Sequence, residues 1–307
     1  MLTYDKLWKG IIEDLSVDFL HYFFPTLCEE IDFSKGVEFL DQELAKLFPE
    51  AEGDNRYVDK LLKVHLKSGA TKWILIHIEV QGYKDGTFSF RMFTYFYRIL
   101  DRYQQNIIAL AIFTDKYEDY HPKSYEYEYH GTTLTYGFNT YKVLAQEESD
   151  LIASDNPFAL VILATQKAIL KGKLDDEALK KVKWDICRLM YERNYEKGKI
   201  QALFYFINRY IHFANKENYA IFAEEFLSVH EKTQKNMGVI DILIEDAKTE
   251  GIEKGIEKGI EKTLLEANLK FASSLIHSTD FDNAKIAILV GVTEEYVANL
   301  RLTLAAK

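Results

Sequence analysis

Cysteine is nearly absent from this chain of 307 residues, which contains only Cys28 and Cys187. The two lie far apart and form no Cys-x-x-Cys pair, so neither a disulfide framework nor a zinc ribbon is available. No run of about 18 apolar residues occurs, and the first residues lack a basic region followed by an apolar stretch. With 48% hydrophobic residues, the sequence predicts a globular, cytoplasmic protein that does not enter a membrane.

Basic residues are outnumbered, and the formal net charge is −10. Residues 1–150 contain 16 Lys and Arg against 25 Asp and Glu, a balance of −9, whereas the rest contains 22 against 23, a balance of −1. This distribution counts against an extended phosphate-binding surface. DNA binding would require a local basic groove or a metal ion that offsets the acidic residues.

The first half of the chain mixes the periodicities of helices and strands. In order, the expected elements are a helix at 4–24 ended by Pro25, a weak strand near 37–40, strands at 57–67 and 72–81 that form a hairpin, a helix at 88–105, a buried strand at 107–113 and a Tyr-rich hairpin at 123–143. This αβββαβ order predicts a mixed α/β domain over 1–150.

The second half has helical periodicity throughout, and proline is absent beyond Pro157. The pattern predicts a helical domain over 151–250, with helices at 156–171, 175–193, 198–213 and 217–230. At 251–263, Gly-Ile-Glu-Lys is repeated three times. In a helix this repeat places its glycines along one stripe, and each such glycine costs about 1 kcal/mol relative to alanine. The repeat is either a close-packing surface that joins copies of the chain or a charged tether between units.

The C-terminal segment, 264–307, has the spacing of a helix-turn-helix. Gly291 is expected to make the turn and Thr293 to cap the second helix, while Val297 and Leu300 pack back on the first. The second helix begins with two glutamates and offers only Arg301 as a base, which suits a major groove poorly. The segment is therefore either a DNA reader or a plain helical hairpin.

The stretch 73–81, WILIHIEVQ, has the pattern of a buried central strand that carries an acidic residue. Because side chains alternate along a strand, His77, Glu79 and Gln81 share one face. His77 is expected to be a core histidine, and Glu79 is either a solvated strand end or part of a site.

Asp59 lies on the neighbouring predicted strand, about as far from the Ser68-Gly69 turn as Glu79 does. The hairpin can therefore bring the two carboxylates together. With the carbonyl of Val80 they would form an oxygen site suited to Mg²⁺, with Mn²⁺ or Ca²⁺ as alternatives. Such a site suits phosphodiester hydrolysis, because the metal lowers the pKa of a bound water and offsets phosphate charge.

These residues resemble a known family. Asp59, followed by Glu79-Val80-Gln81 and by Phe90-Arg91-Met92 with Tyr95, is similar to the PD-(D/E)XK nuclease superfamily. More narrowly, the pattern resembles the recombination-promoting nucleases, also known as YhgA-like transposase-related proteins, which carry Glu-x-Gln where the wider superfamily has Glu-x-Lys. The resemblance covers about 1–145 well.

The resemblance implies a PD-(D/E)XK-like core and a Mg²⁺-dependent DNA endonuclease linked to recombination, transposon-like elements or defence. Asp59 and Glu79 would bind the metal, Gln81 would stand where lysine usually orients the nucleophile, and Arg91 with Tyr95 would face the phosphate. Asp5 or Glu13 of the first helix is a further candidate. The alternative is a nuclease fold of weak or no activity that binds DNA or protein, with its C-terminal helices forming a homo-oligomer.

Overall fold

The computed structural model describes residues 4–42, 58–67, 73–170, 175–213, 216–229, 239, 241–243 and 268–305. It divides into two compact units, one comprising residues 1–175 and 185–212 and the other 176–184 and 213–307. The division falls within helix α8 (Asp176–Glu192). The Gly-Ile-Glu-Lys repeats at 251–263 lie outside the described residues, so both interpretations of them stay predictions.

The first unit is built on a mixed five-stranded sheet, which confirms the predicted α/β class. The strands, in spatial order, are β1 (Val37–Phe39), β2 (Val58–His65), β3 (Trp73–Gln81), β4 (Ile107–Phe113) and β7 (Asn139–Lys142). The first three pair antiparallel, and β3, β4 and β7 are parallel. Parallel neighbours need a crossover connection, and helix α5 (Phe88–Tyr103) supplies it between β3 and β4.

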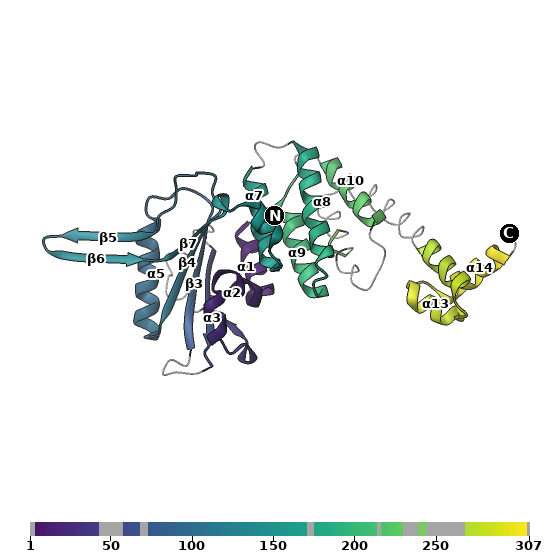
Figure 1. Cartoon of the computed structure of the whole chain (residues 1–307), viewed down its shortest axis with the longest axis horizontal. Helices are drawn as coiled ribbons and strands as arrows, with labels where there is room; N and C mark the ends of the chain where they lie inside the picture. Colours follow the sequence, from purple (N-terminus) through teal and green to yellow (C-terminus); the bar gives the residue numbers. More distant parts are fainter. Residues whose placement is uncertain are drawn as a thin grey trace. The chain divides into compact units, whose positions relative to one another are not determined.

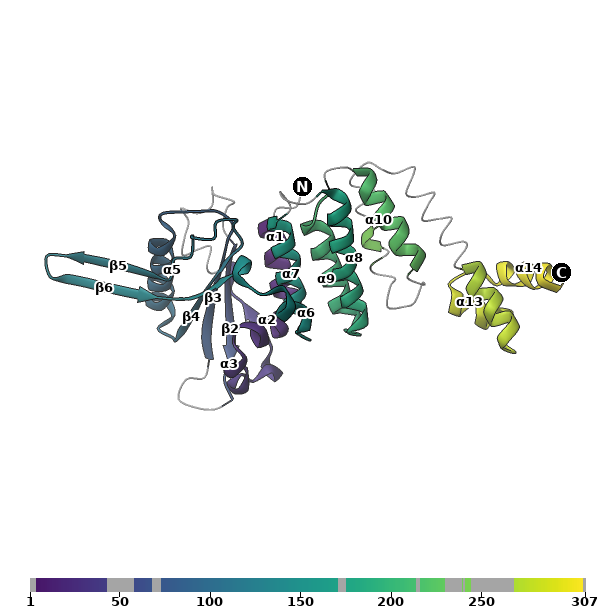
Figure 2. The ribbon, with the colours of Figure 1, turned by 45° about the horizontal axis from the view of Figure 1, so that its top comes forward.

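Helices cover both faces of this sheet (Figures 1 and 2). Helix α5 covers one face, called here the α5 face, where Tyr95 and Ile99 pack against Leu61 and Leu75 of β2 and β3. Helices α1 (Tyr4–Asp14) and α2 (Ser16–Phe23) cover the opposite, α1 face. Coverage on both faces explains why β3 is an almost continuous apolar run.

The helix expected over 4–24 is instead two helices, α1 and α2, separated at Leu15, whose φ of −116° and ψ of 31° are not helical. Leu15 is itself buried, so the break keeps an apolar side chain in the core. Pro25 does more than end a helix. It occupies the first turn of α3 (Pro25–Glu30), where its missing N–H would have had no helical partner anyway.

The Tyr-rich stretch forms a hairpin and one further strand. Strands β5 (Ser124–Tyr129) and β6 (Thr132–Gly137) make a separate two-stranded sheet. Its tight turn uses positive φ at His130 (45°) and Gly131 (83°). After β6 the chain returns to the main sheet as β7, which the sequence pattern had not distinguished from the hairpin.

The helices of the first unit that follow the sheet are α6 (Glu148–Ala153), α7 (Pro157–Ile169) and α9 (Lys197–Tyr210). Helix α7 is buried along residues 157–166, and the Asn156 side chain caps it by accepting a hydrogen bond from the Phe158 amide at 2.8 Å. Trp8 of α1 packs its ring against Phe158 of α7 and Phe206 of α9. These helices therefore share one core with α1.

The second unit contains the first turns of α8, helix α10 (Lys216–Val229) and the pair α13 (Asn283–Val290) and α14 (Glu294–Ala305). The predicted turn geometry of the last pair is confirmed: Gly291 has φ of 73°, and the Thr293 hydroxyl accepts from the Tyr296 amide at 3.2 Å. Val297 and Leu300 are buried against α13, as expected. Within the described ranges, no helix is long and apolar enough to cross a membrane.

Candidate active site

The sheet brings the two predicted metal-binding positions into register. In the antiparallel pairing of β2 with β3, Asp59 stands directly opposite Glu79. Residues opposite one another in an antiparallel pair have neighbouring Cα atoms and belong to the same face of the sheet. The Asp59 side chain lies outside the described side chains, so the register is the observation that links these two positions.

Glu79 is fully buried on the α5 face, and so is its neighbour His77. The Nε2 atom of His77 lies 3.8 Å from Oε1 of Glu79. On its other side the His77 ring meets the Tyr95 ring edge to face, with centroids 5.2 Å apart. The end of β3 thus places a carboxylate in the interior beside a titratable ring, where an ionised group is costly without compensating interactions.

Gln81 is buried and held by two hydrogen bonds. Its Oε1 accepts from the Arg91 guanidinium at 2.8 Å, and its Nε2 donates to the carbonyl of Tyr83 at 2.6 Å. Arg91 extends from the first turn of α5 and also donates to the Asp85 carboxylate at 2.5 Å. The side chain predicted to orient a nucleophile is therefore fixed by the helix that covers it.

Asp85 organises the entry into α5. Its Oδ1 accepts from both the amide and the hydroxyl of Thr87 at 2.8 Å, while Oδ2 bonds Arg91. Burial alone would raise the pKa of Asp85, but the hydrogen bonds from Thr87 and from Arg91 outweigh it and hold the pKa below its usual value. An ionised Asp85 keeps the Arg91 guanidinium directed at Gln81.

Tyr95, expected to face a phosphate, instead lies in the core of the first unit with 4% of its surface exposed. It packs with Leu61, Leu75 and Ile99 between α5 and the sheet. The structure therefore places Tyr95 one turn along α5 from Arg91, with its ring against that of His77.

Asp5 and Glu13 belong to α1 and lie on the other face of the sheet. Glu13 pairs with the ammonium group of Lys60, a buried lysine of β2 that also contacts Asp41 at 2.5 Å. Asp5 lies 3.3 Å from Lys9 and lines a pocket described below. The structure brings neither carboxylate to the side of the sheet that carries Glu79 and Gln81.

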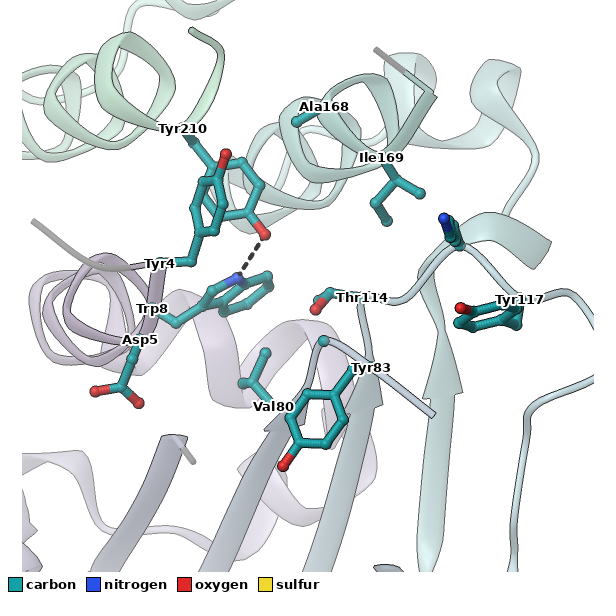
Figure 3. A pocket seen from close by; sticks show the side chains of 12 residues that line it. Tyr4, Asp5, Trp8, Val80, Tyr83, Thr114, Tyr117, Ala168, Ile169 and Tyr210 are labelled. Carbon is teal, nitrogen blue, oxygen red and sulfur yellow. Dashed lines mark hydrogen bonds between the residues drawn. The ribbon is translucent and has the colours of Figure 1, made fainter. Parts of the chain in front are cut away.

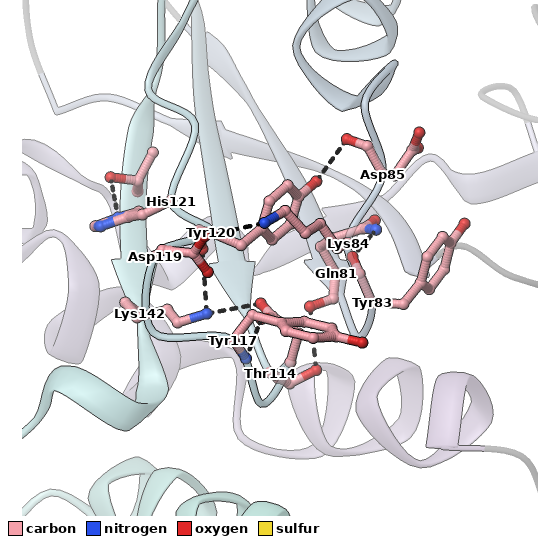
Figure 4. A network of polar contacts seen from close by, with 12 residues as sticks. Gln81, Tyr83, Lys84, Asp85, Thr114, Tyr117, Asp119, Tyr120, His121 and Lys142 are labelled. Carbon is pink, nitrogen blue, oxygen red and sulfur yellow. Dashed lines mark hydrogen bonds and ion pairs between the residues drawn. The ribbon is translucent and has the colours of Figure 1, made fainter.

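A second polar cluster lies at the same end of the sheet, across the strands from Gln81 (Figure 4). In the strand register Gln81 aligns with Phe113, and Phe113 aligns with Lys142 of β7. The Lys142 ammonium donates to Asp115 at 2.8 Å and to the carbonyl of Tyr120 at 3.1 Å, and both charged side chains are buried. The Tyr120 hydroxyl donates to the carbonyl of Asp85 at 2.9 Å, which connects the cluster to the entry of α5. Burial raises the pKa of Tyr120 to about 12, so this hydroxyl stays a donor at neutral pH.

A pocket opens on the α1 face at the carboxyl ends of β3 and β4 (Figure 3). Its volume is about 420 Å³. The lining comes from five separate segments and is rich in aromatic rings: Tyr4, Asp5, Trp8, Val80, Gly82, Tyr83, Thr114, Lys116, Tyr117, Ala168, Ile169 and Tyr210. Val80 is thus shared, since its side chain lines the pocket and its carbonyl belongs to the predicted metal site.

The donor set at the end of β3 fits a hard cation through its oxygen atoms. The predicted ligands are the carboxylates of Asp59 and Glu79 and the carbonyl of Val80. Among the side chains that the structure describes, which do not include Asp59, no three His, Cys, Asp or Glu residues form a metal-binding group. A site for Mg²⁺ therefore depends on Asp59 joining Glu79 across the strand pair.

Two features of this region escaped the sequence analysis. Asp85 could have been found, because an Asp two residues before Thr87 at the start of a helix is a typical capping pattern. The pocket had no local signal, since its lining residues are up to 206 positions apart, from Tyr4 to Tyr210. Only the fold brings them together.

The fold and the polar residues at the end of β3 define an α/β protein with a mixed sheet and a buried acidic strand end. Residues 4–112 match the family model described as "Putative transposase, YhgA-like", which confirms the resemblance to the YhgA-like proteins. The matched segment runs from the start of α1 to the penultimate residue of β4 and contains every predicted site residue. The family description indicates a function connected with DNA. No curated protein and no solved structure matches the chain.

Proposed function

We propose that the protein is a metal-dependent DNA endonuclease with a PD-(D/E)XK-like core, associated with recombination, transposon-like elements or defence. The observation that carries this proposal is the register of Asp59 with Glu79 at one end of the β2–β3 hairpin. Gln81 follows on the same face beside Arg91. The family match over the same segment supports a DNA substrate.

In this proposal Asp59, Glu79 and the Val80 carbonyl hold Mg²⁺, which lowers the pKa of a bound water and offsets phosphate charge. Gln81 accepts from Arg91 and donates one amide hydrogen to the Tyr83 carbonyl. Its second amide hydrogen would orient a water or a phosphate oxygen without contributing charge. Arg91 supplies the positive charge that Gln81 lacks, at a distance set by Asp85.

One observation favours the second candidate, a nuclease fold that binds DNA or protein without useful turnover. Glu79 and Gln81 are each 0% exposed, and helix α5 covers both. A hydrated metal ion and a phosphodiester need access to these groups. Turnover therefore requires the elements that cover these groups to move, whereas a binding module requires no such movement.

Cleavage of supercoiled plasmid by the full chain separates the two candidates. Wild type is compared with Glu79→Gln and Asp59→Asn in the presence of Mg²⁺, Mn²⁺, Ca²⁺ or EDTA. Glu128→Gln, an exposed glutamate on β5, is the matched control. These amide substitutions keep the side-chain shape, so lost activity is not a consequence of a cavity in the core.

The nuclease predicts nicking that requires the metal, persists in Glu128→Gln and falls at least about 100-fold in both ligand variants, since even outer-shell partners of metal ligands cost 10–100-fold. Equal activity in all four proteins would mean that a contaminating nuclease is responsible. If the wild type cleaves no plasmid with any metal but still binds DNA, the result would favour the binding module instead of the nuclease.

A further inference from the structure

The pocket at the ends of β3 and β4 has a rigid back wall made of two buried aromatic residues. Trp8 and Tyr210 are 1% and 6% exposed, and the Trp8 indole donates to the Tyr210 hydroxyl at 3.3 Å (Figure 3). Burial raises the pKa of Tyr210 to about 12, so the hydroxyl stays neutral. Tyr4 packs on Tyr210 with ring centroids 4.6 Å apart. The wall therefore presents flat, uncharged surfaces.

The floor of the pocket is fixed by two hydrogen bonds from Thr114, after β4, to the last residue of β3. The Thr114 amide donates to the carbonyl of Gln81 at 2.8 Å, and the Thr114 hydroxyl donates to the same carbonyl at 3.3 Å. Gly82 follows directly and has no side chain to fill the space beside Thr114. The pocket is thus preformed, and one wall is the strand that carries Glu79.

The open side of the pocket combines an exposed ring with positive charge. Tyr117 is 42% exposed, and the ammonium groups of Lys116 and Lys84 lie 5.6 Å and 5.8 Å from its ring centroid. Lys84 is paired with Asp119 at 3.0 Å. Lys116 also lines the pocket, so an aromatic platform and a cation occur together there. The lining also contains the Asp5 carboxylate, which lies 3.3 Å from the Lys9 ammonium. Lys116 therefore supplies the positive charge of the lining that a phosphate ligand needs.

Aromatic walls beside an exposed cation fit a nucleotide better than a purely apolar ligand. A base stacks on aromatic rings whatever its sequence, and a lysine binds the adjoining phosphate as a point charge. The position also fits, because ligands of open α/β sheets bind outside the carboxyl ends of parallel strands. A paired base is inaccessible to such a pocket, so the ligand must be single-stranded or turned out of the duplex.

We propose that this pocket binds one unstacked base of a DNA strand, with Lys116 on its phosphate, and so positions the neighbouring phosphodiester at the end of β3. The proposal rests on the proposed function for the role of that phosphodiester, and on the pocket alone for the base. Tyr117 and Lys116 are positioning residues in this account. Val80 links the two parts, since it lines the pocket and lies between Glu79 and Gln81.

The test measures binding of a fluorescently labelled oligothymidylate to the full chain in EDTA, so that no cleavage intervenes. Tyr117→Ala is expected to weaken binding about tenfold, in line with the loss of one base-stacking platform. Lys116→Ala is expected to reduce the salt dependence of binding by slightly less than one unit of slope. Tyr97→Ala is the matched control, because Tyr97 is 57% exposed on α5 and does not line the pocket.

Two further ligands show whether the bound base belongs to a single strand, a duplex or a free nucleotide. A fully paired duplex of the same length should bind more weakly than the single strand, and thymidine monophosphate should compete only at much higher concentration. Competition by the mononucleotide at the same concentration as the strand would overturn the DNA assignment in favour of a free nucleotide. Equal affinities of Tyr117→Ala and Tyr97→Ala for the strand would overturn the base pocket altogether.

The binding assay and the cleavage assay test the pocket and the nuclease independently. A wild type that binds through Tyr117 but cleaves nothing with any metal contradicts the nuclease and leaves the pocket in place. A wild type that cleaves, with Tyr117→Ala binding and cleaving as well as Tyr97→Ala, contradicts the pocket and leaves the nuclease in place.

Discussion

The two faces of the sheet differ most where β3 ends. On the α5 face, Glu79 and Gln81 are completely covered, and Gln81, Arg91 and Asp85 form a chain of hydrogen bonds. On the α1 face, Val80 opens into a pocket of about 420 Å³. One face holds the polar groups suited to chemistry, and the other offers the space for a ligand.

This difference follows from the alternation of side chains along a strand. Among three consecutive residues, Glu79 and Gln81 point to the α5 face and Val80 points to the α1 face. The two faces are connected here only through the backbone of β3. On the α5 face the polar groups are held in one arrangement by hydrogen bonds, whereas the α1 face leaves open space beside Val80. The comparison therefore predicts that substitutions on the α5 face act mainly through buried charge, and those on the α1 face through lost contacts to a partly open space.

The largest effect is expected from Lys142→Met, on the closed side. The side chains of Lys142 and Asp115 are 3% and 1% exposed. Removing the lysine ammonium therefore leaves the buried carboxylate without its cationic partner. We expect a loss of about 3–5 kcal/mol in the free energy of unfolding, measured by urea denaturation. The control is Lys84→Met, whose partner Asp119 is 75% exposed, so its free energy of unfolding should stay nearly unchanged. Similar losses in the two variants would contradict the distinction between the closed and open regions.

A smaller effect is expected from Tyr210→Phe, in the wall of the pocket. The substitution removes only the hydroxyl that accepts the Trp8 indole hydrogen bond. We expect a loss of about 1 kcal/mol in the free energy of unfolding, near the low end for a buried donor that loses its partner, because the indole N–H is uncharged and Trp8 borders the pocket. Thermal unfolding measures this loss, with Tyr129→Phe as the control, because Tyr129 is 62% exposed. A loss as large as that of Lys142→Met would show that the wall is as closed as the other face.

The smallest effect is a dependence on pH that Asp85 confers on the α5 face. Its pKa in the folded state is below the usual 3.8, because the hydrogen bonds from Thr87 and Arg91 outweigh burial. A lowered folded pKa gives stability that is fully present above 3.8 and is lost as pH falls through the folded value. Asp85→Asn should therefore lower stability at neutral pH and weaken its decline below pH 3.8. Parallel acid-unfolding curves for the two proteins would contradict this contribution.

Much of the fold could be predicted because its signals are local. The run at 107–113 is strand β4, the helical period at 88–105 is α5, and the pairing of the Asp59 and Glu79 strands is as expected. The break at Leu15 could not be predicted, since both α1 and α2 keep the same apolar spacing and only packing separates them.

The site was predictable to a different degree on each face. Alternation alone places Glu79 and Gln81 together, and the helix period places Arg91 in reach of Gln81. Neither periodicity reveals that α1 packs on the opposite face of the sheet. That packing separates Asp5 and Glu13 from Glu79. The pocket requires α7 and α9, two helices whose sequences carry no sign of what they enclose.

The sharing of β3 between two faces also has an evolutionary consequence. Substitutions at Val80 alter the pocket, while those at Glu79 and Gln81 alter the opposite face. Neighbouring codons therefore determine different surfaces of the protein. The lining of the pocket can change in evolution while the buried Glu79 and Gln81 stay the same. Within the nine residues of β3, a substitution that alters one face therefore needs no compensating change on the other.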